Sequence, residues 1–421
     1  MDKFIIEGGK TLSGKVCVSG AKNASLALLP AALLAPGKSI LKNTPELNDV
    51  FTMIKLLKHL GAEINFENYQ IEIDTSHIND LTAPYEHVKK MRASVYVLGP
   101  LLSRYGRAKV SLPGGCAWGP RPINLHLEAL RKMGAEINLV DGYIEAKADK
   151  LKGAEIYFDI SSVGATGNTL MAAVLADGIT TINNAAIEPE ISNLAEFLVK
   201  MGAKIEGIGT KTLKIEGVDE LKPSQINTIA DRIEAGTLLI AGAITGGNVQ
   251  LSGIDPSLLK AVLVKLEAAG FNLDFDDNMI ALSSPNNNVL PANVSTSIFP
   301  GFPTDMQAQW TALMTQANGT SSVKDNIYFD RFKHVPELNR LGANINVVEN
   351  AAIITGGKEL HGAKVMSTDL RASASLVLAG LAAKGTTEVL RVYHLDRGYQ
   401  RIEEKLKQLG ANIERVSGKE F

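Results

Sequence analysis

The residues Leu60-Gly61-Ala62-Glu63-Ile64 belong to a pattern that decides the fold of this chain. The same order (an apolar residue, Gly, a small or apolar residue, any residue, an apolar residue) returns five more times. The further glycines are Gly134, Gly202, Gly270, Gly342 and Gly410. Successive copies lie about 70 residues apart, and six units of that length account for nearly all 421 residues. Such a fixed period indicates six copies of one structural unit.

Each unit is predicted to contain two helices and several strands. The repeated glycine suits a helix end, because Gly adopts the left-handed conformation without a Cβ clash, and the alternating residues after it predict a strand. An amphipathic helix is expected before it, as at residues 50–60 or 399–409. A helix of small and apolar residues, such as 24–35, comes earlier in each unit. It ends near a second glycine: Gly37, Gly106, Gly178, Gly246, Gly319 or Gly385. Helices that are apolar on nearly all sides belong inside a domain, and the alternation of helices with strands indicates an α/β fold.

The six units divide naturally into two domains of three. We expect residues 22–229 to form one domain, and residues 1–21 with 230–421 to form the other, with hinge crossings at about 20–22 and 229–231. The first 20 residues have strand character but no helix of their own, so we expect them to pair with the C-terminal units. A cleft between two domains joined in this way is a usual ligand site.

Charged and polar residues recur at the starts of the apolar helices. The equivalent positions are Asn23, Arg92, Gly164, Arg232, Asp305 and Arg371, and Arg121 and Arg397 hold matching places at second helices. Arginine opposes the dipole at a helix N-terminus, so repeated arginines there favour an anion held by side chains and backbone N–H groups. The alternative is that each arginine pairs with a nearby carboxylate.

The least regular segment runs from Ser111 to Pro122, with the sequence SLPGGCAWGPRP. Three prolines and three glycines in twelve residues exclude helix and strand, and irregular loops often carry function. A thiol near an arginine and a helix start has a lowered pKa, so Cys116 is a candidate acid or nucleophile. An inert packed thiol is the alternative for Cys116. The other cysteine, Cys17, is predicted to be a core thiol.

Composition excludes several classes of protein. The net charge of −2 gives no basic field for nucleic acid, and the apolar stretch 24–35 is too short to span a membrane and contains Pro30. Two cysteines in different contexts do not suggest a disulfide framework. No metal-ligand spacing, GxGxxG or Walker motif appears, so no metal or cofactor is expected. A soluble cytoplasmic protein is predicted.

Seven segments carry a family resemblance. They are residues 19–24 (SGAKNA), 90–94 (KMRAS), 112–116 (LPGGC), 119–122 (GPRP), 302–307 (FPTDMQ), 369–373 (DLRAS) and 396–399 (DRGY). Together they resemble the UDP-N-acetylglucosamine 1-carboxyvinyltransferase family of the EPSP synthase superfamily, over residues 1 to about 416. The resemblance implies a two-domain inside-out α/β barrel of six βαβαββ-like repeats. It also implies transfer of the enolpyruvyl group of phosphoenolpyruvate to the 3-hydroxyl of UDP-N-acetylglucosamine with release of phosphate, the first committed step of peptidoglycan synthesis.

The resemblance implies residue roles as well. Cys116 protonates C3 of phosphoenolpyruvate, can add to it covalently as a 2-(S-cysteinyl)pyruvate O-phosphothioketal, and is alkylated by the inhibitor fosfomycin. Asp305 takes the proton of the sugar hydroxyl or orients that hydroxyl, although Thr304-Asp305 would also cap a helix well. Lys22 and Arg397 join Cys116 and Asp305 as catalytic residues. The implied substrate-binding residues are Lys22, Asn23, Arg92, Arg121, Pro122, Ile123, Asn124, Leu125, Val163, Gly164, Asp305, Ile327, Arg331, Asp369, Arg371 and Arg397. Lysine and arginine suit an anionic substrate.

Two positions depart from some family members, and two other functions stay open. Ile160 stands near the place of a lysine and Asn48 at the place of a basic residue, which leaves the contacts to the diphosphate undecided. An EPSP synthase-like transfer to shikimate 3-phosphate is one alternative, against which Cys116 and the Arg121-Pro122 segment argue. A non-catalytic repeat scaffold is the other, against which the matched cations argue.

Overall fold

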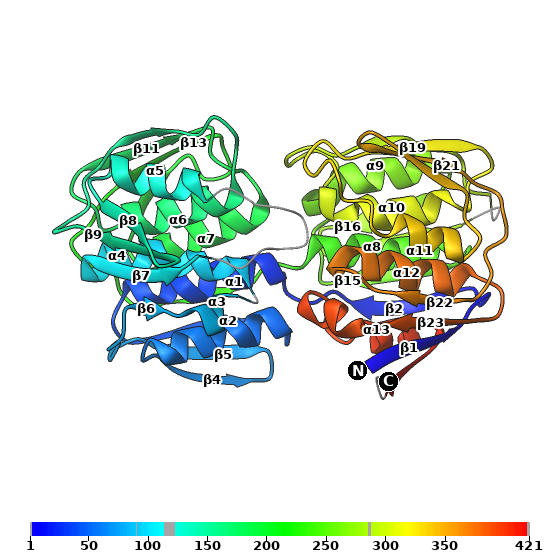
Figure 1. Cartoon of the computed structure of the whole chain (residues 1–421), viewed down its shortest axis with the longest axis horizontal. Coiled ribbons are helices and arrows are strands. Elements are labelled where there is room, and N and C mark those ends of the chain that lie inside the picture. The colour runs from blue at the N-terminus through cyan, green and yellow to red at the C-terminus, as the bar shows by residue number, and fades with distance from the viewer. Residues whose placement is uncertain (1, 90, 113–122, 285–287, 419–421) are drawn as a thin grey trace. The chain divides into compact units, whose positions relative to one another are not determined.

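The computed structural model describes residues 2–89, 91–112, 123–284 and 288–418. The chain forms two compact units. Unit 1 comprises Met1–Ser19 and Ala230–Phe421, and unit 2 comprises Gly20–Ile229 (Figure 1). The chain therefore passes between the units twice. In unit 1 the backbone N–H of Asp231 donates to Ser19 O at 2.8 Å, and in unit 2 that of Ala21 donates to Ile229 O at 2.7 Å.

Three four-stranded sheets can be traced in the described part of unit 2. The first has the order β14 (Gln225–Asn227), β3 (Lys38–Lys42), β5 (Gln70–Asp74), β4 (Glu63–Glu67). The second has the order β6 (Thr82–Ala83), β7 (Arg107–Ser111), β9 (Tyr143–Lys147), β8 (Glu136–Val140). The third has the order β10 (Glu155–Tyr157), β11 (Ile179–Asn183), β13 (Thr212–Glu216), β12 (Lys204–Glu206).

The described residues of unit 1 form three matching sheets. The first has the order β2 (Ser13–Cys17), β15 (Asn248–Ser252), β17 (Met279–Ser283), β16 (Asn272–Asp276). The second has the order β18 (Val294–Ser295), β19 (Thr320–Lys324), β21 (Ala351–Thr355), β20 (Ile345–Val348). The third has the order β22 (Lys364–Met366), β23 (Thr386–Leu390), β1 (Asp2–Glu7), β24 (Asn412–Ser417).

All six sheets share one pairing pattern. The first two strands are parallel, and the third strand is antiparallel to both of its neighbours, as in the register Val110↔Ile144 between β7 and β9. The expectation that the N-terminal strands pair with the C-terminal units is confirmed, because β2 pairs with β15 and β1 pairs with β23 and β24. Within unit 2, β14 from the end of its segment pairs with β3 near the beginning. In each unit, a sheet therefore joins strands that are far apart in the sequence.

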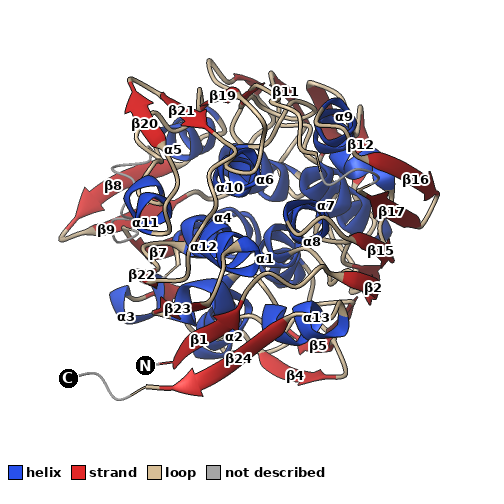
Figure 2. Cartoon of the chain, turned by 90° about the vertical axis from the view of Figure 1, so that its right-hand side faces the viewer, coloured by secondary structure: helices blue, strands red, loops and turns tan. Residues whose placement is uncertain are grey.

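Each unit has inner helices surrounded by the other elements (Figure 2). In unit 2 they are α1 (Lys22–Ala31, followed by the 3-10 helix η1, Ala32–Leu34), η2 (Arg92–Val97) with α4 (Leu98–Tyr105), and α6 (Val163–Ala173). In unit 1 they are α8 (Arg232–Ile244), η4 (Thr304–Met306) with α10 (Gln307–Met314), and α12 (Leu370–Ala382). Residues 233–244 of α8 are all buried, which confirms the prediction that these apolar helices lie inside.

The remaining helices are shorter or more amphipathic. They are α2 (Asn48–His59), α3 (Tyr85–Val88), α5 (Asn124–Lys132) and α7 (Pro189–Lys200) in unit 2, and η3 (Pro256–Leu259), α9 (Lys260–Ala268), α11 (Val335–Arg340), η5 (Val392–Arg397) and α13 (Ile402–Gln408) in unit 1. Buried apolar residues of each unit form their own core cluster. No described helix is long and apolar enough to cross a bilayer.

The glycines behave as the repeat predicts. The φ angles of Gly61, Gly134, Gly202, Gly270, Gly342 and Gly410 lie between 92° and 108°, in the left-handed region. Two local predictions were wrong. The helix expected over 399–409 begins only at Ile402, because Arg401 has a φ of 43°, which is incompatible with an earlier start. Cys17 is exposed, because the strand turns Val16 and Val18 inward and leaves Cys17 on the opposite face.

Candidate active site

A carboxylate held between two arginines lies at the N-terminal ends of two inner helices of unit 1. Asp305 is in η4, and its Oδ1 accepts a hydrogen bond from Arg331 Nη1 at 2.8 Å, while its Oδ2 accepts one from Arg371 Nη2 at 2.8 Å. The side chains of Arg331 and Arg371 are 9% and 4% exposed, whereas that of Asp305 is 28% exposed. These three residues, the Asp305 cluster, form an ion-pair triad whose carboxylate is its most accessible member.

The two arginines control the charge of Asp305. Burial by itself would raise the pKa of the carboxyl group, but Arg371 and Arg331 outweigh burial and hold that pKa well below its usual value. Burial by itself would lower the pKa of the Arg371 guanidinium, but Asp305 outweighs it and raises that pKa. Asp305 is therefore ionised at neutral pH and, in this arrangement, is a weak base.

A second carboxylate fixes the geometry around the cluster. Asp325 accepts hydrogen bonds from the Thr304 hydroxyl at 2.7 Å and from the backbone N–H of Ile327 at 2.9 Å. Arg331 Nη1 also donates to the Thr304 hydroxyl oxygen at 3.0 Å. Asp325 thereby ties η4 to the segment that carries Ile327 and Arg331, so the structure brings three predicted site residues together: Asp305, Ile327 and Arg331.

Helix capping explains where Asp369 and Arg371 lie. The Asp369 carboxylate accepts hydrogen bonds from the N–H groups of Arg371 (2.9 Å) and Ala372 (3.1 Å), so it caps α12 and fixes the start of the helix that carries Arg371. The corresponding prediction for Asp305 was wrong. Its side chain caps neither η4 nor α10, because both oxygens are taken by arginine.

The structure shows where the arginines expected at helix starts lie, and whether Arg371 has a carboxylate partner. Arg92 and Arg232 are the first residues of η2 and α8, and Arg371 is the second residue of α12, as predicted. For Arg371 the alternative of a carboxylate partner is confirmed. Arg397 does not begin an outer helix. It ends η5, five residues before α13, and helps to lower the pKa of His394, after the larger effect of burial.

In unit 2 the start of α1 carries a second buried ion pair. Lys22 Nζ lies 2.8 Å from Asp49 Oδ2, with side-chain exposures of 13% and 5%. Asp49 is in the first turn of α2, directly after Asn48. Asn23, the second residue of α1, is exposed. Asp49 thus holds the ammonium group of Lys22 at the start of α1, where the next residue, Asn23, is exposed.

A neutral histidine lies beside Gly164. An ideal Cβ on Gly164 would lie 3.0 Å from His126 Nε2, so a larger residue here would push the imidazole away. Asn168 receives the N–H of Gly99 on its Oδ1 (2.6 Å), so its Nδ2 is the donor to His126 Nδ1 (3.0 Å). Burial, with a smaller effect of Arg92, lowers the pKa of His126 to about 4.

These contacts place a neutral imidazole, protonated on Nε2, next to the N-terminus of α6, where the predicted residues Val163 and Gly164 lie. Ser162 caps the same helix by accepting from Ala165 N at 3.3 Å. Ile160, which stands near the place of a lysine in some family members, is 72% exposed. Among the described residues of this segment, a helix N-terminus and a neutral N–H donor are therefore the features that suit an anion.

Three predicted residues, Cys116, Arg121 and Pro122, lie outside the described part of the chain. The next three are described: Ile123 precedes α5, and Asn124 and Leu125 begin it. No described group of three or more His, Cys, Asp or Glu residues could hold a metal ion.

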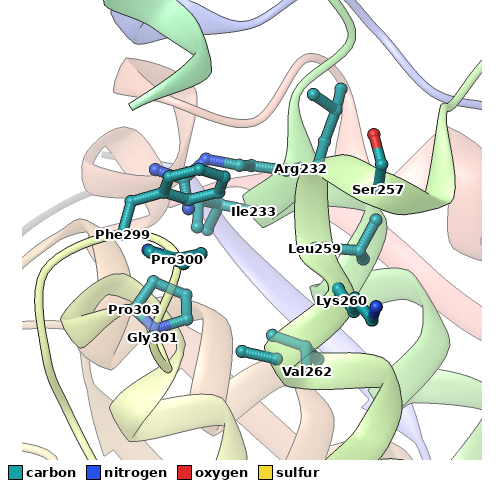
Figure 3. A pocket seen from close by; sticks show the side chains of 12 residues that line it. Arg232, Ile233, Ser257, Leu259, Lys260, Val262, Phe299, Pro300, Gly301 and Pro303 are labelled. Carbon is teal, nitrogen blue, oxygen red and sulfur yellow. The ribbon is translucent and has the colours of Figure 1, made fainter. Parts of the chain in front are cut away.

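A hollow in unit 1 has one wall formed by residues that directly precede η4, the helix that carries Asp305 (Figure 3). It is lined by Arg232 of α8, by the segment from Phe299 to Pro303 and by residues of η3 and α9. The guanidinium of Arg232 lies over the ring of Phe299, with 5.5 Å between the Cζ atom and the ring centroid. The hollow has a volume of about 20 Å³, which accommodates little more than one water molecule. It is therefore too small for a nucleotide sugar.

Sequence reasoning missed Asp49, His126 and Asp325. His126 directly follows the predicted segment 121–125, so its position carried a signal. Asp49 directly follows Asn48, but its pairing with Lys22 and that of Asp325 with Thr304 join residues far apart in the sequence and leave no local pattern.

Comparisons with known proteins identify the family. Residues 6–406 match the family model of EPSP synthase (3-phosphoshikimate 1-carboxyvinyltransferase). The chain is 61% identical to UDP-N-acetylglucosamine 1-carboxyvinyltransferase of Chloroherpeton thalassium, over 100% of this chain and 99% of the relative. It is 58% identical to the protein of the same name from Chlorobium phaeovibrioides, over 100% of both chains.

Solved structures agree on the fold. The enolpyruvyl transferase NikO from Streptomyces tendae superimposes with a TM-score of 0.90 at 25% identity, over 99% of both chains. EPSP synthase from Acinetobacter baumannii gives 0.75 at 19% identity, over 99% of this chain and 100% of that structure. The predicted α/β fold of two three-repeat units, an inside-out barrel, is thereby confirmed. The chain belongs to the UDP-N-acetylglucosamine 1-carboxyvinyltransferases of the EPSP synthase family.

Proposed function

We propose that the chain transfers the enolpyruvyl group of phosphoenolpyruvate to the 3-hydroxyl of UDP-N-acetylglucosamine and releases phosphate. The observation that carries this proposal is the full-length identity of 61% with a relative of that name. The geometry agrees with it, because both units present cations and hydrogen-bond donors at the starts of inner helices: Lys22 and Arg92 in unit 2, Arg371 in unit 1. These groups suit a substrate with a carboxylate and a phosphate.

The reaction has two steps. In the addition, the sugar oxygen bonds to C2 of phosphoenolpyruvate, its proton leaves, and C3 gains a proton to become a methyl group. In the elimination, the bond from C2 to the phosphate oxygen breaks, C3 loses a proton, and the enol ether and inorganic phosphate result. We assign the proton donor at C3 to Cys116. Lys22, Asn23, Arg92, Arg121, Asp369, Arg371 and Arg397 are proposed to hold the substrates.

The low pKa of Asp305 bears on its role. A carboxylate with both oxygens bound to arginine accepts a proton poorly but accepts hydrogen bonds well, so it suits orienting the sugar hydroxyl. If Arg371 moves its hydrogen bonds to an anionic substrate, the carboxylate loses a cation and its basicity rises. Proton abstraction by Asp305 would then be coupled to binding of phosphoenolpyruvate.

For the nucleotide we propose the start of α6 and the segment before α5. Val163 and Gly164 offer backbone N–H groups to the diphosphate, and residues 121–125 hold the uridine, with Ile327 and Arg331 near the sugar. Fosfomycin is proposed to alkylate Cys116. Phosphoenolpyruvate can itself leave a covalent adduct on that sulfur. With these phosphorylated substrates, the cytoplasm is the proposed location.

Phosphate release tests the proposal. The wild type is assayed with phosphoenolpyruvate and either UDP-N-acetylglucosamine or shikimate 3-phosphate, with and without fosfomycin. The expected result is release that needs the nucleotide sugar and stops on treatment with fosfomycin. Release only with shikimate 3-phosphate would indicate the EPSP synthase reaction, and no release with either acceptor would favour the non-catalytic scaffold.

A further inference from the structure

In the DRGY segment at 396–399, Arg397 is the residue with a proposed role in the reaction, and Tyr399 makes the most extensive contacts to the Asp305 cluster. Tyr399 follows η5, and its side chain is buried among the three inner helices of unit 1 with 1% exposure. Its hydroxyl lies 3.0 Å from Thr237 Oγ1 of α8 and 3.1 Å from Gln309 Nε2 of α10. Its ring lies under Arg371 of α12, with 5.4 Å from the guanidinium Cζ to the ring centroid.

The direction of each hydrogen bond follows from the partners. Thr237 donates its own proton to Ile233 O at 2.7 Å, so its oxygen is left to accept from the Tyr399 hydroxyl. Gln309 Nε2 donates one hydrogen to Asp305 O at 2.8 Å, and the other faces both Tyr399 Oη at 3.1 Å and Thr237 Oγ1 at 3.2 Å. The Tyr399 hydroxyl thus donates to α8 and accepts from α10.

This network touches the Asp305 cluster at two points. Gln309 holds the backbone carbonyl of Asp305, and the electron-rich face of the Tyr399 ring supports the guanidinium that binds the Asp305 carboxylate. Backbone and side chain of Asp305 are therefore both held through groups that contact Tyr399. The network is shielded from solvent, because Thr237 and Gln309 are 1% and 0% exposed.

We propose that Tyr399 is a positioning residue of the enolpyruvyl transfer, which keeps Arg371 and Asp305 in their reactive arrangement. The proposal rests on the proposed function, because it assigns a purpose to the arrangement only if Arg371 and Asp305 act on the substrates. A purely structural role would make the same contacts but would leave turnover by folded molecules unchanged.

The test uses steady-state phosphate release by the full-length protein, together with its melting temperature. Tyr399→Phe keeps the ring and leaves no buried donor without a partner, because Gln309 Nε2 keeps Asp305 O and Thr237 Oγ1 as acceptors and the Thr237 hydroxyl keeps Ile233 O. We expect kcat per folded molecule to fall about 10-fold, because small losses of alignment are costly in catalysis. The KM for UDP-N-acetylglucosamine should change by less than about 2-fold, which separates positioning from binding.

Three further variants complete the test. Thr237→Val removes the acceptor of the Tyr399 proton and should lower kcat about as much as Tyr399→Phe does. Thr237→Ser keeps the hydroxyl, so its kcat should stay near the wild-type value. Tyr393→Phe is the matched control, because Tyr393 belongs to η5 and is 39% exposed, and it should behave as the wild type. An unchanged kcat in Tyr399→Phe, or an equal loss in Thr237→Ser and Thr237→Val, would overturn the inference. An inactive wild type would instead overturn the proposed function, and this inference with it.

Discussion

Replacing Asp305 by asparagine isolates the contribution of the carboxylate charge in unit 1. The change keeps the size of the side chain but leaves the guanidinium groups of Arg331 and Arg371, which are 9% and 4% exposed, without their counter-ion. Removing one partner of a buried ion pair costs about 3–5 kcal/mol. Since Asp305 keeps 28% exposure, water reaches the site, so we expect a loss of free energy of unfolding near the lower value, about 3 kcal/mol.

The assay follows urea unfolding by tryptophan fluorescence. The chain has two tryptophans, and in a Trp118→Phe background the buried Trp310 of α10 reports on unit 1 alone. With a denaturant slope of about 3 kcal/mol per M, the midpoint should fall by about 1 M urea. Because the ions are buried, about 1 M salt should leave most of this difference intact.

The control and the pH dependence sharpen the test. Asp330→Asn, at an exposed position, should change the free energy of unfolding by less than about 0.5 kcal/mol. The pKa of Asp305 is depressed in the folded state, so its stabilisation is complete above the ordinary value of 3.8 and declines as the pH falls toward the folded-state pKa. A loss below about 1 kcal/mol at pH 7, or a loss that 1 M salt abolishes, would refute the buried triad.

Three other changes test unit 2 and the cysteine loop. Asp49→Asn should lower kcat/KM about 10-fold by releasing the Lys22 ammonium, and Asp80→Asn, at an exposed carboxylate, should leave it unchanged. Between pH 6.5 and about 4 only the unfolded state protonates His126, so as the pH falls over that range the free energy of unfolding should drop by roughly 3 kcal/mol more in the wild type than in His126→Gln. Cys116→Ser should lose the mass increment that fosfomycin adds to the wild type, and retention of that increment would place the alkylation elsewhere.

Much of the fold could be predicted because it is encoded locally. The glycines after each outer helix adopt left-handed φ angles, and the apolar helices lie inside, as the repeat required. The sequence-based predictions failed where contacts from elsewhere in the fold determine the position of a side chain. Asp305 has the chemistry of a helix cap, but Arg331 and Arg371 occupy its oxygens. Cys17 looked like a core residue, but the pleat of β2 gave the inner positions to Val16 and Val18.

By itself, the sequence determined the six-unit architecture, the placement of Arg92, Arg232 and Arg371 at helix starts and the family, because period, turn chemistry and motif are properties of short segments. Only the tertiary structure decided which charges meet. The partners of Asp305 lie 26 and 66 residues away, and the hydroxyl of Tyr399 meets a threonine 162 residues away. Such pairs follow from how helices pack, and burial then strengthens each interaction, so the charge state of the site is a property of the folded chain.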